Sequence, residues 1–167
     1  MIEVVGGTGS SFQLLSFPLP SGSNLGKRVI KNGLMCNDVT VTSKINLQTN
    51  TDEAGIVVGF QDVGNHIDIT VSPYWDEMVI WSWVNNQMTA IAGTGHGGVV
   101  VNTNQDYWLK AVLRVDGSIE GYWSTDGTNF TRKVFSTVSG TVLGGVGYAT
   151  NGYSPPHTHF DDFNVSQ

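Results

Sequence analysis

The stretch 107–130, YWLKAVLRVDGSIEGYWSTDGTNF, constrains the fold more than any other part of the chain. Apolar side chains occupy every second position from 109 to 115, which is the period of a β-strand with one face in a core and one toward water. Asp116-Gly117 and Asp126-Gly127 mark turns, because glycine accepts a positive φ and aspartate tolerates it. The stretch is therefore predicted to form a β-hairpin followed by a second turn.

The faces of this hairpin depend on the length of its loop. A two-residue loop at Asp116-Gly117 would mix charged and apolar side chains on one face. A three-residue loop from Asp116 to Ser118 pairs Arg114 with Glu120 and buries Trp123, so we predict the longer loop. Five side chains then share the outer face: Trp108, Lys110, Arg114, Glu120 and Tyr122.

Similar strand patterns recur along the rest of the chain, and no long segment shows the 3.6-residue period of an amphipathic helix. With 21 glycines and only 13% charged residues, the composition is also typical of all-β proteins. A chain of 167 residues has the length of one domain, so we predict a single domain, 1–167, formed by an antiparallel β-sandwich of two sheets. The N-terminal edge, about residues 1–20, is left unassigned. The further expected strands are 39–47, 54–60, 66–71, 78–84, 99–102, 132–136, 145–150 and 159–166.

The charge pattern excludes two classes of partner. The formal net charge is −6 and the sequence pI about 4.9, and the eight Lys and Arg residues are scattered singly. No basic stripe is present to neutralise phosphates or anionic lipids, so we expect no nucleic-acid binding. No apolar run is long enough to span a bilayer, so we expect no membrane insertion.

Cysteine use and the N-terminal residues bear on where such a chain acts. Cys36 is the only cysteine, so no internal disulfide forms. Residues 1–11, MIEVVGGTGSS, lack the basic and apolar regions of a signal peptide. Two interpretations stay open: a module of a longer protein, or a protein such as a virion component that needs no signal. In both cases the expected location is extracellular or on a virion surface.

Four segments together resemble a known family. They are 55–65 (GIVVGFQDVGN), the 108–130 hairpin, 144–150 and the closing 160–165 (FDDFNV). In this order they resemble the concanavalin A-like, laminin G-like jelly rolls of the lectin and glucanase superfamily, over about residues 39–167. The family's usual opening Asp-Asp-Phe segment is not found, and 1–5 is the only candidate to replace it.

The resemblance implies a jelly roll and allows several functions. Members of the superfamily are mostly sugar-binding modules, lectins, glycosidases, polysaccharide lyases, adhesion domains and parts of virus particles. Our leading interpretation is a non-catalytic, lectin-like module that binds a glycan or cell-surface polysaccharide, or that mediates adhesion. The alternative is a structural, decoration or fibre protein of a virus particle, whose partners are other copies or other structural proteins.

An enzyme is the third interpretation. Glycosidases need two carboxylates about 5–10 Å apart. The chain has four glutamates, and neither the Glu-x-Asp-x-Glu motif of the laminarinase-like branch nor the Gln-x-His motif of the alginate-lyase branch is present. Asp68 and Glu120 are candidates for a shared groove, but Arg114 is expected to pair with Glu120. We therefore expect no glycoside hydrolase or lyase activity and no catalytic residues.

Aromatic side chains provide the candidate glycan site, because flat rings stack on the apolar face of a sugar. Trp108 and Tyr122 are expected on the outer face. Trp81 and Trp83 share one face of their strand, and they form an exposed stripe if that face is not the core; the alternative is that both fill the core. The candidate glycan-binding residues are Trp108, Tyr122, Arg114, Glu120, Trp81 and Trp83.

No cofactor is required by this interpretation, and two patterns raise the question of a metal. The resemblance implies a structural Ca²⁺ near the chain termini, for which Asp161 and Asp162 are the candidate ligands. The alternative is a bulged edge strand whose aspartates face solvent. His157 and His159 also fall on one face of a strand, but no third ligand is apparent nearby, so we expect no transition metal there.

Overall fold

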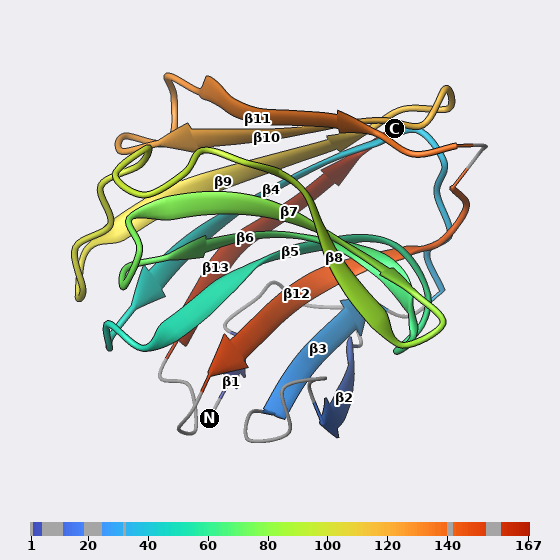
Figure 1. Cartoon of the computed structure of the whole chain (residues 1–167), viewed down its shortest axis with the longest axis horizontal. Helices are drawn as coiled ribbons and strands as arrows, with labels where there is room; N and C mark the ends of the chain where they lie inside the picture. The colour runs from blue at the N-terminus through green and yellow to red at the C-terminus, as the bar shows by residue number, and fades with distance from the viewer. Residues whose placement is uncertain (1, 5–11, 19–24, 32, 140–141, 153–157) are drawn as a thin grey trace.

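The computed structural model describes residues 2–4, 12–18, 25–31, 33–139, 142–152 and 158–167 (Figure 1). Every regular element in these ranges is a β-strand, and the strands form two stacked sheets. Among the described residues, no helix is long and apolar enough to cross a membrane.

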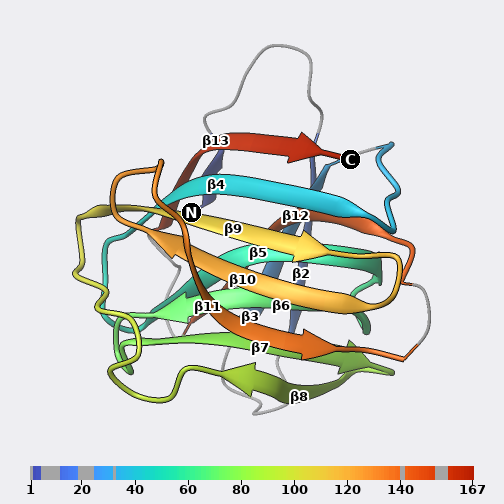
Figure 2. The ribbon, with the colours of Figure 1, turned by 90° about the horizontal axis from the view of Figure 1, so that it is seen from above.

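One sheet has six strands, and Figure 2 looks onto it from above. All its neighbouring strands are antiparallel except the first pair, which is parallel. In spatial order the strands are β1 (Ile2–Val4), β13 (Thr158–Ser166), β4 (Val39–Leu47), β9 (Asp106–Leu113), β10 (Ser118–Ser124) and β11 (Thr131–Thr137).

The other sheet has seven strands and is antiparallel throughout. Its order is β2 (Phe12–Pro18), β3 (Leu25–Lys31), β12 (Gly145–Gly152), β5 (Asp52–Asp62), β6 (Asn65–Ser72), β7 (Glu77–Val84) and β8 (Gln87–Gly93).

The hydrophobic core lies between the two sheets. Val41 and Leu109 face inward from the six-stranded sheet, while Ile69 and Ile80 face inward from the other, and each is almost fully buried. Side chains alternate along these strands, so each sheet has an inner face in the core and an outer face turned away from it. The predicted two-sheet antiparallel β-sandwich of jelly-roll type is confirmed.

The β9–β10 hairpin corrects the predicted register. A turn over Arg114–Gly117 replaces the three-residue loop, and the amide of Gly117 donates to the carbonyl oxygen of Arg114 at 2.9 Å. Glu120 pairs with Val112, two positions before Arg114, and Ile119 pairs with Leu113. The predicted Arg114–Glu120 pair is therefore wrong. A shift of two residues preserves the face of every side chain. The prediction that Trp123 is buried is therefore confirmed.

Two further strand predictions differ from the structure. Residues 99–102 form no strand: the alternation of buried Val99 and Val101 with exposed Val100 belongs to a loop. The amides of Val99 and Val101 donate to the backbone oxygen and to Oδ1 of Asp76, both at 3.0 Å. Strand β8 was not predicted, because it is an edge strand whose mostly exposed side chains show no strict alternation.

Candidate functional site

Polar side chains gather on the outer face of the seven-stranded sheet. Along β6, His66, Asp68 and Thr70 occupy the positions that face away from the core, yet all three are buried. Pairing with β7 places Asp68 beside Trp81 and His66 beside Trp83. Strand alternation and register therefore collect polar and aromatic groups into one cluster.

Arg28 of β3 holds this cluster together. Its Nη2 donates to Oδ2 of Asp68, and both side chains are fully buried. Its Nε donates to Nε2 of His66 at 3.2 Å. Its Nη1 donates to Oδ1 of Asn151 at 3.1 Å and to the carbonyl oxygen of Thr150 at 3.3 Å. The guanidinium group is thus bonded to β6 and β12 at once, in the forked geometry that suits arginine.

Asp68 is an ionised carboxylate in this environment. Burial raises its pKa, but the positive charge of Arg28 and its hydrogen bond to the carboxylate bring the pKa below its ordinary value. Oδ2 also accepts the indole N–H of Trp83 at 3.0 Å. Oδ1 is buried and accepts no hydrogen bond within the described part of the chain. One carboxylate oxygen therefore keeps its full capacity to accept a donor.

The contacts of His66 explain why Oδ1 of Asp68 has no donor. Nδ1 of His66 lies 3.2 Å from the carbonyl oxygen of Asp62, so this nitrogen carries the proton, an assignment made from its partner. Nε2 accepts from Arg28 and therefore cannot donate to Oδ1 of Asp68, which lies 3.5 Å away. The ring also stacks on Trp83, with centroids 5.1 Å apart and an interplanar angle of 13°.

A second carboxylate, that of Glu53 on β5, lies on the same outer face. Its Oε1 accepts the indole N–H of Trp81 at 2.7 Å and the hydroxyl of Thr70. Burial of the carboxylate raises its pKa, and the hydrogen bonds from Thr70, Trp81 and Asn151 offset only part of that rise. Glu53 and Trp81 remain partly exposed, unlike the Arg28–Asp68 pair, so they form the accessible edge of the cluster.

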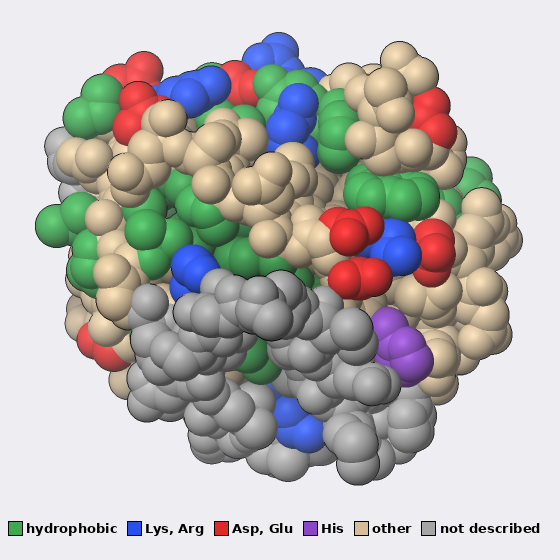
Figure 3. Space-filling model, turned by 180° about the vertical axis from the view of Figure 1, so that it is seen from behind, with side chains coloured by type: hydrophobic (Ala, Val, Ile, Leu, Met, Phe, Trp, Pro, Cys, Tyr) green, Lys and Arg blue, Asp and Glu red, His purple; other side chains and the backbone are tan. Residues whose placement is uncertain are grey.

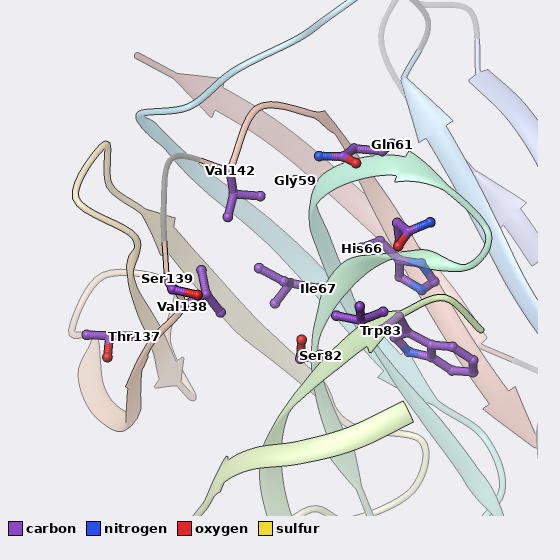
Figure 4. Close-up of a pocket in the computed structure, with 12 residues that line it drawn as sticks. Gly59, Gln61, His66, Ile67, Ser82, Trp83, Thr137, Val138, Ser139 and Val142 are labelled. Atoms are coloured by element: carbon purple, nitrogen blue, oxygen red, sulfur yellow. The ribbon is translucent and has the colours of Figure 1, made fainter. Parts of the chain in front are cut away.

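A pocket of about 410 Å³ adjoins this cluster (Figure 4). His66 and Trp83 lie on one side of it, and Val138 and Val142 lie on the other, from the segment that follows β11. Gln61 contributes an exposed amide. The mixed lining suits a ligand that is partly apolar and partly hydroxylated.

The aromatic residues predicted to bind glycan lie on two different sheets. Trp108 and Tyr122 are on the outer face of the six-stranded sheet, and both are half-buried. Trp81 and Trp83 are on the outer face of the other sheet, where Trp83 is only 3% exposed. Trp81 and Trp83 therefore neither fill the core nor form an exposed stripe. They face away from the core, and Trp83 is buried there. The aromatic candidates therefore do not share one sheet face.

The charged residues predicted for the site have other partners. Arg114 pairs with Asp38 at 3.0 Å. Glu120 accepts from Arg132 at 3.3 Å and from the hydroxyl of Tyr122. The structure therefore does not bring Arg114 and Glu120 together, because the hairpin register moved by two residues.

The predicted metal ligands lie at a bulge in β13. Pairing with β4 shifts register between Asp161 and Asn164, and Asp161 lies 3.4 Å from Nζ of Lys44. No group of three or more His, Cys, Asp or Glu residues suited to a metal occurs in the described ranges. His157 lies outside the described residues, and His159 contacts Gln48 at 3.2 Å.

Sequence reasoning missed Arg28, His66 and Glu53 as site residues. Arg28 lies on a strand that was not predicted, so nothing indicated which way its side chain points. His66 and Asp68 alternate with apolar positions, which indicates an outer face but not that a second layer of contacts buries it. One signal could have found this site. His66 and Asp68 alternate along one strand, which is unusual in a chain with only 13% charged residues.

The comparisons with known proteins support the fold. No family model and no curated protein sequence matches the chain. Among solved structures, the carbohydrate-binding module CBM66 from Bacillus subtilis is similar with a TM-score of 0.70 and 15% identity, covering 99% of this chain and 100% of that one.

Two other solved structures extend this picture. The exoplasmic/lumenal domain of VIP36 in its Ca²⁺/Man3GlcNAc-bound form has a TM-score of 0.54 and 10% identity, over 95% of this chain and 83% of that one. The GH43 protein BlXynB from Bacillus licheniformis has a TM-score of 0.57 and 12% identity, and 92% of this chain spans 36% of it. At these identities the similarities establish a shared β-sandwich and leave function to be argued from the site.

Proposed function

We propose that the chain is a non-catalytic, lectin-like carbohydrate-binding module with its main site on the outer face of the seven-stranded sheet. The observation that carries the proposal is the Glu53–Trp81 pair, a partly exposed glutamate and indole that are hydrogen-bonded to each other above a buried ionic network. The similarity in fold to a carbohydrate-binding module and to a lectin domain agrees with it, as does the concanavalin A-like resemblance of the sequence.

The pair meets the chemical needs of sugar recognition. A sugar ring has an apolar face that stacks on an indole, and a rim of hydroxyls that donate to carboxylates. The 2.7 Å hydrogen bond from Trp81 to Oε1 of Glu53 sets the ring and the carboxylate in a fixed relation. A site held in this way loses little conformational entropy when ligand binds.

The buried network beneath the pair supports the same conclusion. Burying Arg28 and Asp68 requires full desolvation of two charges, and apolar replacements of such pairs are often as stable or more stable. Perturbed titratable groups that gather on one face are typical of functional sites. We infer that Arg28 and Asp68 position the indole of Trp83, and that Glu53 and Trp81 contact the ligand.

The two carboxylates do not make a convincing catalytic pair. The pKa of Glu53 is raised and that of Asp68 is lowered, a contrast that also occurs in acid–base pairs. However, Oδ2 of Asp68 is occupied by Arg28 and Trp83, and the whole side chain is buried. Asp68 has no access to an anomeric carbon, so binding is the better assignment.

A binding titration tests the proposal. The protein is screened on a glycan array, and the tightest neutral oligosaccharide is then titrated by calorimetry into wild type, Trp81→Ala and Glu53→Gln. We expect each variant to weaken binding at this site by about tenfold or more, as loss of a central aromatic or polar contact does. Phe135→Ala is the matched control, because this ring is 50% exposed on β11 of the other sheet.

The same experiment separates the competing functions. Unchanged affinity in both Trp81→Ala and Glu53→Gln would refute the site. Absence of any glycan binding, together with self-assembly into large particles by light scattering, would favour a structural protein of a virus particle. Binding that persists in EDTA is expected, because the proposed contacts use no metal ligand. A module of this kind is expected to act outside the cell or on a particle surface.

A further inference from the structure

A second pocket, of about 440 Å³, lies on the outer face of the six-stranded sheet. It is lined by three aromatic residues, Trp108, Phe130 and Phe163, by three polar residues, Thr42, Asp162 and Asn164, and by Gly127. The ring of Phe163 also packs against Tyr148 of the core. We propose that this pocket, the Trp108 pocket, is a second and independent sugar-binding site for an uncharged sugar ring, so that the chain carries binding sites on opposite faces.

Trp108 is held in place from one side. Gly127 has a φ of +74°, and a Cβ added there would lie 2.9 Å from Cε2 and 3.0 Å from Nε1 of the indole. The backbone at Gly127 therefore packs against one face of the ring, a contact that a side chain would prevent. Trp108 is only partly buried and lines the pocket, so we infer that its uncovered part is the surface on which a ligand ring stacks.

The loop that carries Gly127 is built around Asp126. Oδ1 of Asp126 accepts the amides of Thr128 and Asn129, both at 2.8 Å, and Oδ2 accepts the side-chain amide of Asn129 at 2.7 Å. The hydroxyl of Ser124 donates to Oδ1 as well, at 2.8 Å. The hydrogen bonds from Asn129 and Thr128 lower the pKa of Asp126, so the loop keeps this arrangement at neutral pH.

The polar groups of the pocket have unused hydrogen-bonding capacity. The bulge in β13 gives Asp162 a φ of 52° and interrupts pairing with β4 between Asp161 and Asn164. Within the described ranges, the side chains of Thr42, Asp162 and Asn164 make no hydrogen bond. A carboxylate, an amide and a hydroxyl around an indole are the groups that bind a polyhydroxylated ring.

The charges near the pocket favour an uncharged sugar over an acidic one. Nζ of Lys44 lies 3.7 Å from Asp106 and 3.4 Å from Asp161, so its charge is already balanced. In the view from behind, Figure 3 shows acidic side chains gathered around a basic side chain. Asp162 forms no salt bridge of its own among the described residues, and it interacts with Lys44 only at longer range. A uronate would meet this carboxylate with a like charge.

Lys110 also has partners, because its ammonium group lies over two aromatic rings. This changes the role expected for Tyr122. Nζ of Lys110 lies 4.1 Å from the ring centroid of Tyr122 and 4.7 Å from that of Phe130. The hydroxyl of Tyr122 donates to Glu120. These contacts make Tyr122 part of a cation–π and hydrogen-bond network, and they leave Trp108 as the stacking ring of this pocket.

The two sites are physically separate. Trp108 projects from the outer face of β9, and Trp81 projects from the outer face of β7 in the other sheet. The core of the sandwich lies between them. A ligand on one face cannot contact the other, so one chain can hold two glycan strands at once. Such a module gains apparent affinity for surfaces that present many copies of a sugar.

Calorimetry with variants of each face tests this proposal independently of the first site. The probes are a neutral glucan tetrasaccharide, mannan and fructan tetrasaccharides, and a polygalacturonate tetrasaccharide. The neutral probe that binds wild type is titrated into Trp108→Ala, Trp81→Ala and the Phe135→Ala control. We expect a stoichiometry of two for wild type and the control, and of one for each tryptophan variant.

The outcomes distinguish the two proposals. If Trp108→Ala keeps wild-type binding while Trp81→Ala loses it, the Trp108 pocket is refuted and the first site stands. The reverse result would refute the first site and support this one. If neither variant changes binding of a probe that binds wild type, both assignments are overturned.

Two further measurements locate the ligand and its charge preference. In a spectrum of the five indole N–H groups, the signal that disappears in Trp108→Ala should shift when probe is added to wild type. Asp162→Asn should improve binding of the polygalacturonate probe about tenfold relative to the neutral probe. A Trp108 signal unaffected by saturating probe, or a wild type that prefers polygalacturonate, would overturn the proposal.

Discussion

The indole N–H of Trp81 donates to Oε1 of Glu53 at 2.7 Å, across the outer face of the seven-stranded sheet. The two residues belong to β7 and β5, with β6 between them. Thr70 on β6 takes part in the same contact, because its hydroxyl donates to the same oxygen of Glu53. The contact joins three strands on the outer face, which also carries the small buried cluster of Ile30, Val57 and Ala149, apart from the main core between the sheets.

The first prediction concerns the pH dependence of stability. Burial raises the pKa of Glu53 above the ordinary value of 4.5. A carboxyl with a raised pKa contributes stability below its unfolded pKa, and this contribution is lost as pH rises through the folded pKa. Urea unfolding should therefore show a component of stability that declines above about pH 4.5. Glu53→Gln should lack it, and an unchanged pH profile in this variant would contradict the assignment.

The second prediction concerns the buried ion pair. Asp68→Asn leaves the buried guanidinium of Arg28 without its counter-charge, which should lower the free energy of unfolding by about 3–5 kcal/mol. The double variant Arg28→Met with Asp68→Leu removes both charges, and it should be considerably more stable than Asp68→Asn. Urea unfolding curves of the three proteins check this. Equal losses in the two variants would show that shape rather than charge decides stability here.

Glycan binding by the double variant provides the functional control. If the Arg28–Asp68 pair serves to position Trp83 and the pocket beside it, the double variant should fold but bind glycan more weakly than wild type. Full binding by a folded double variant would assign the network to folding specificity alone.

The fold was largely predictable from the sequence, and the main site was not. Strands such as 39–47 alternate strictly between buried and half-buried side chains. The face of a side chain depends only on whether its position is odd or even, so the burial of Trp123 was predicted correctly despite the two-residue register error. Which outer face becomes a site depends on contacts between strands that are distant in sequence. Arg28 and Asp68 are 40 residues apart, and no local pattern pairs them.

Only one part of the Trp108 pocket was predictable from the sequence, namely the face on which Trp108 lies. The hairpin pattern placed Trp108 on an outer face, and the structure agrees. The glycine that packs against its ring lies in the loop after β10, and the bulge at Asp162 lies in β13, which β4 separates from β9. Neither contact follows from the hairpin pattern.

The third prediction is the absence of glycoside cleavage. Asp68 is enclosed by Arg28 and Trp83, so it has no access to an anomeric carbon as the catalytic partner of Glu53. Incubation with neutral and acidic polysaccharides should release no reducing sugar. Release that is abolished by Glu53→Gln would overturn the assignment as a binding module, and Glu120→Gln serves as the control carboxylate on the other sheet.

The last prediction isolates the contact between Gly127 and Trp108. Gly127→Ala introduces two effects, a strained backbone at a φ of +74° and a methyl group 2.9 Å from the indole. Gly95→Ala is the matched control, because Gly95 has a φ of +72° and a Cβ there meets no atom within 4 Å. Backbone strain alone should lower the stability of each variant by about 1–2 kcal/mol.

Only Gly127→Ala should also displace the ring. We therefore expect it to lose more stability than Gly95→Ala in urea unfolding, and to shift the indole N–H signal of Trp108. It should also weaken neutral-sugar binding at the Trp108 pocket, whereas Gly95→Ala should leave that binding unchanged. If the two variants bind alike, the ring does not depend on Gly127 for its orientation, and the stacking geometry proposed for this pocket is wrong.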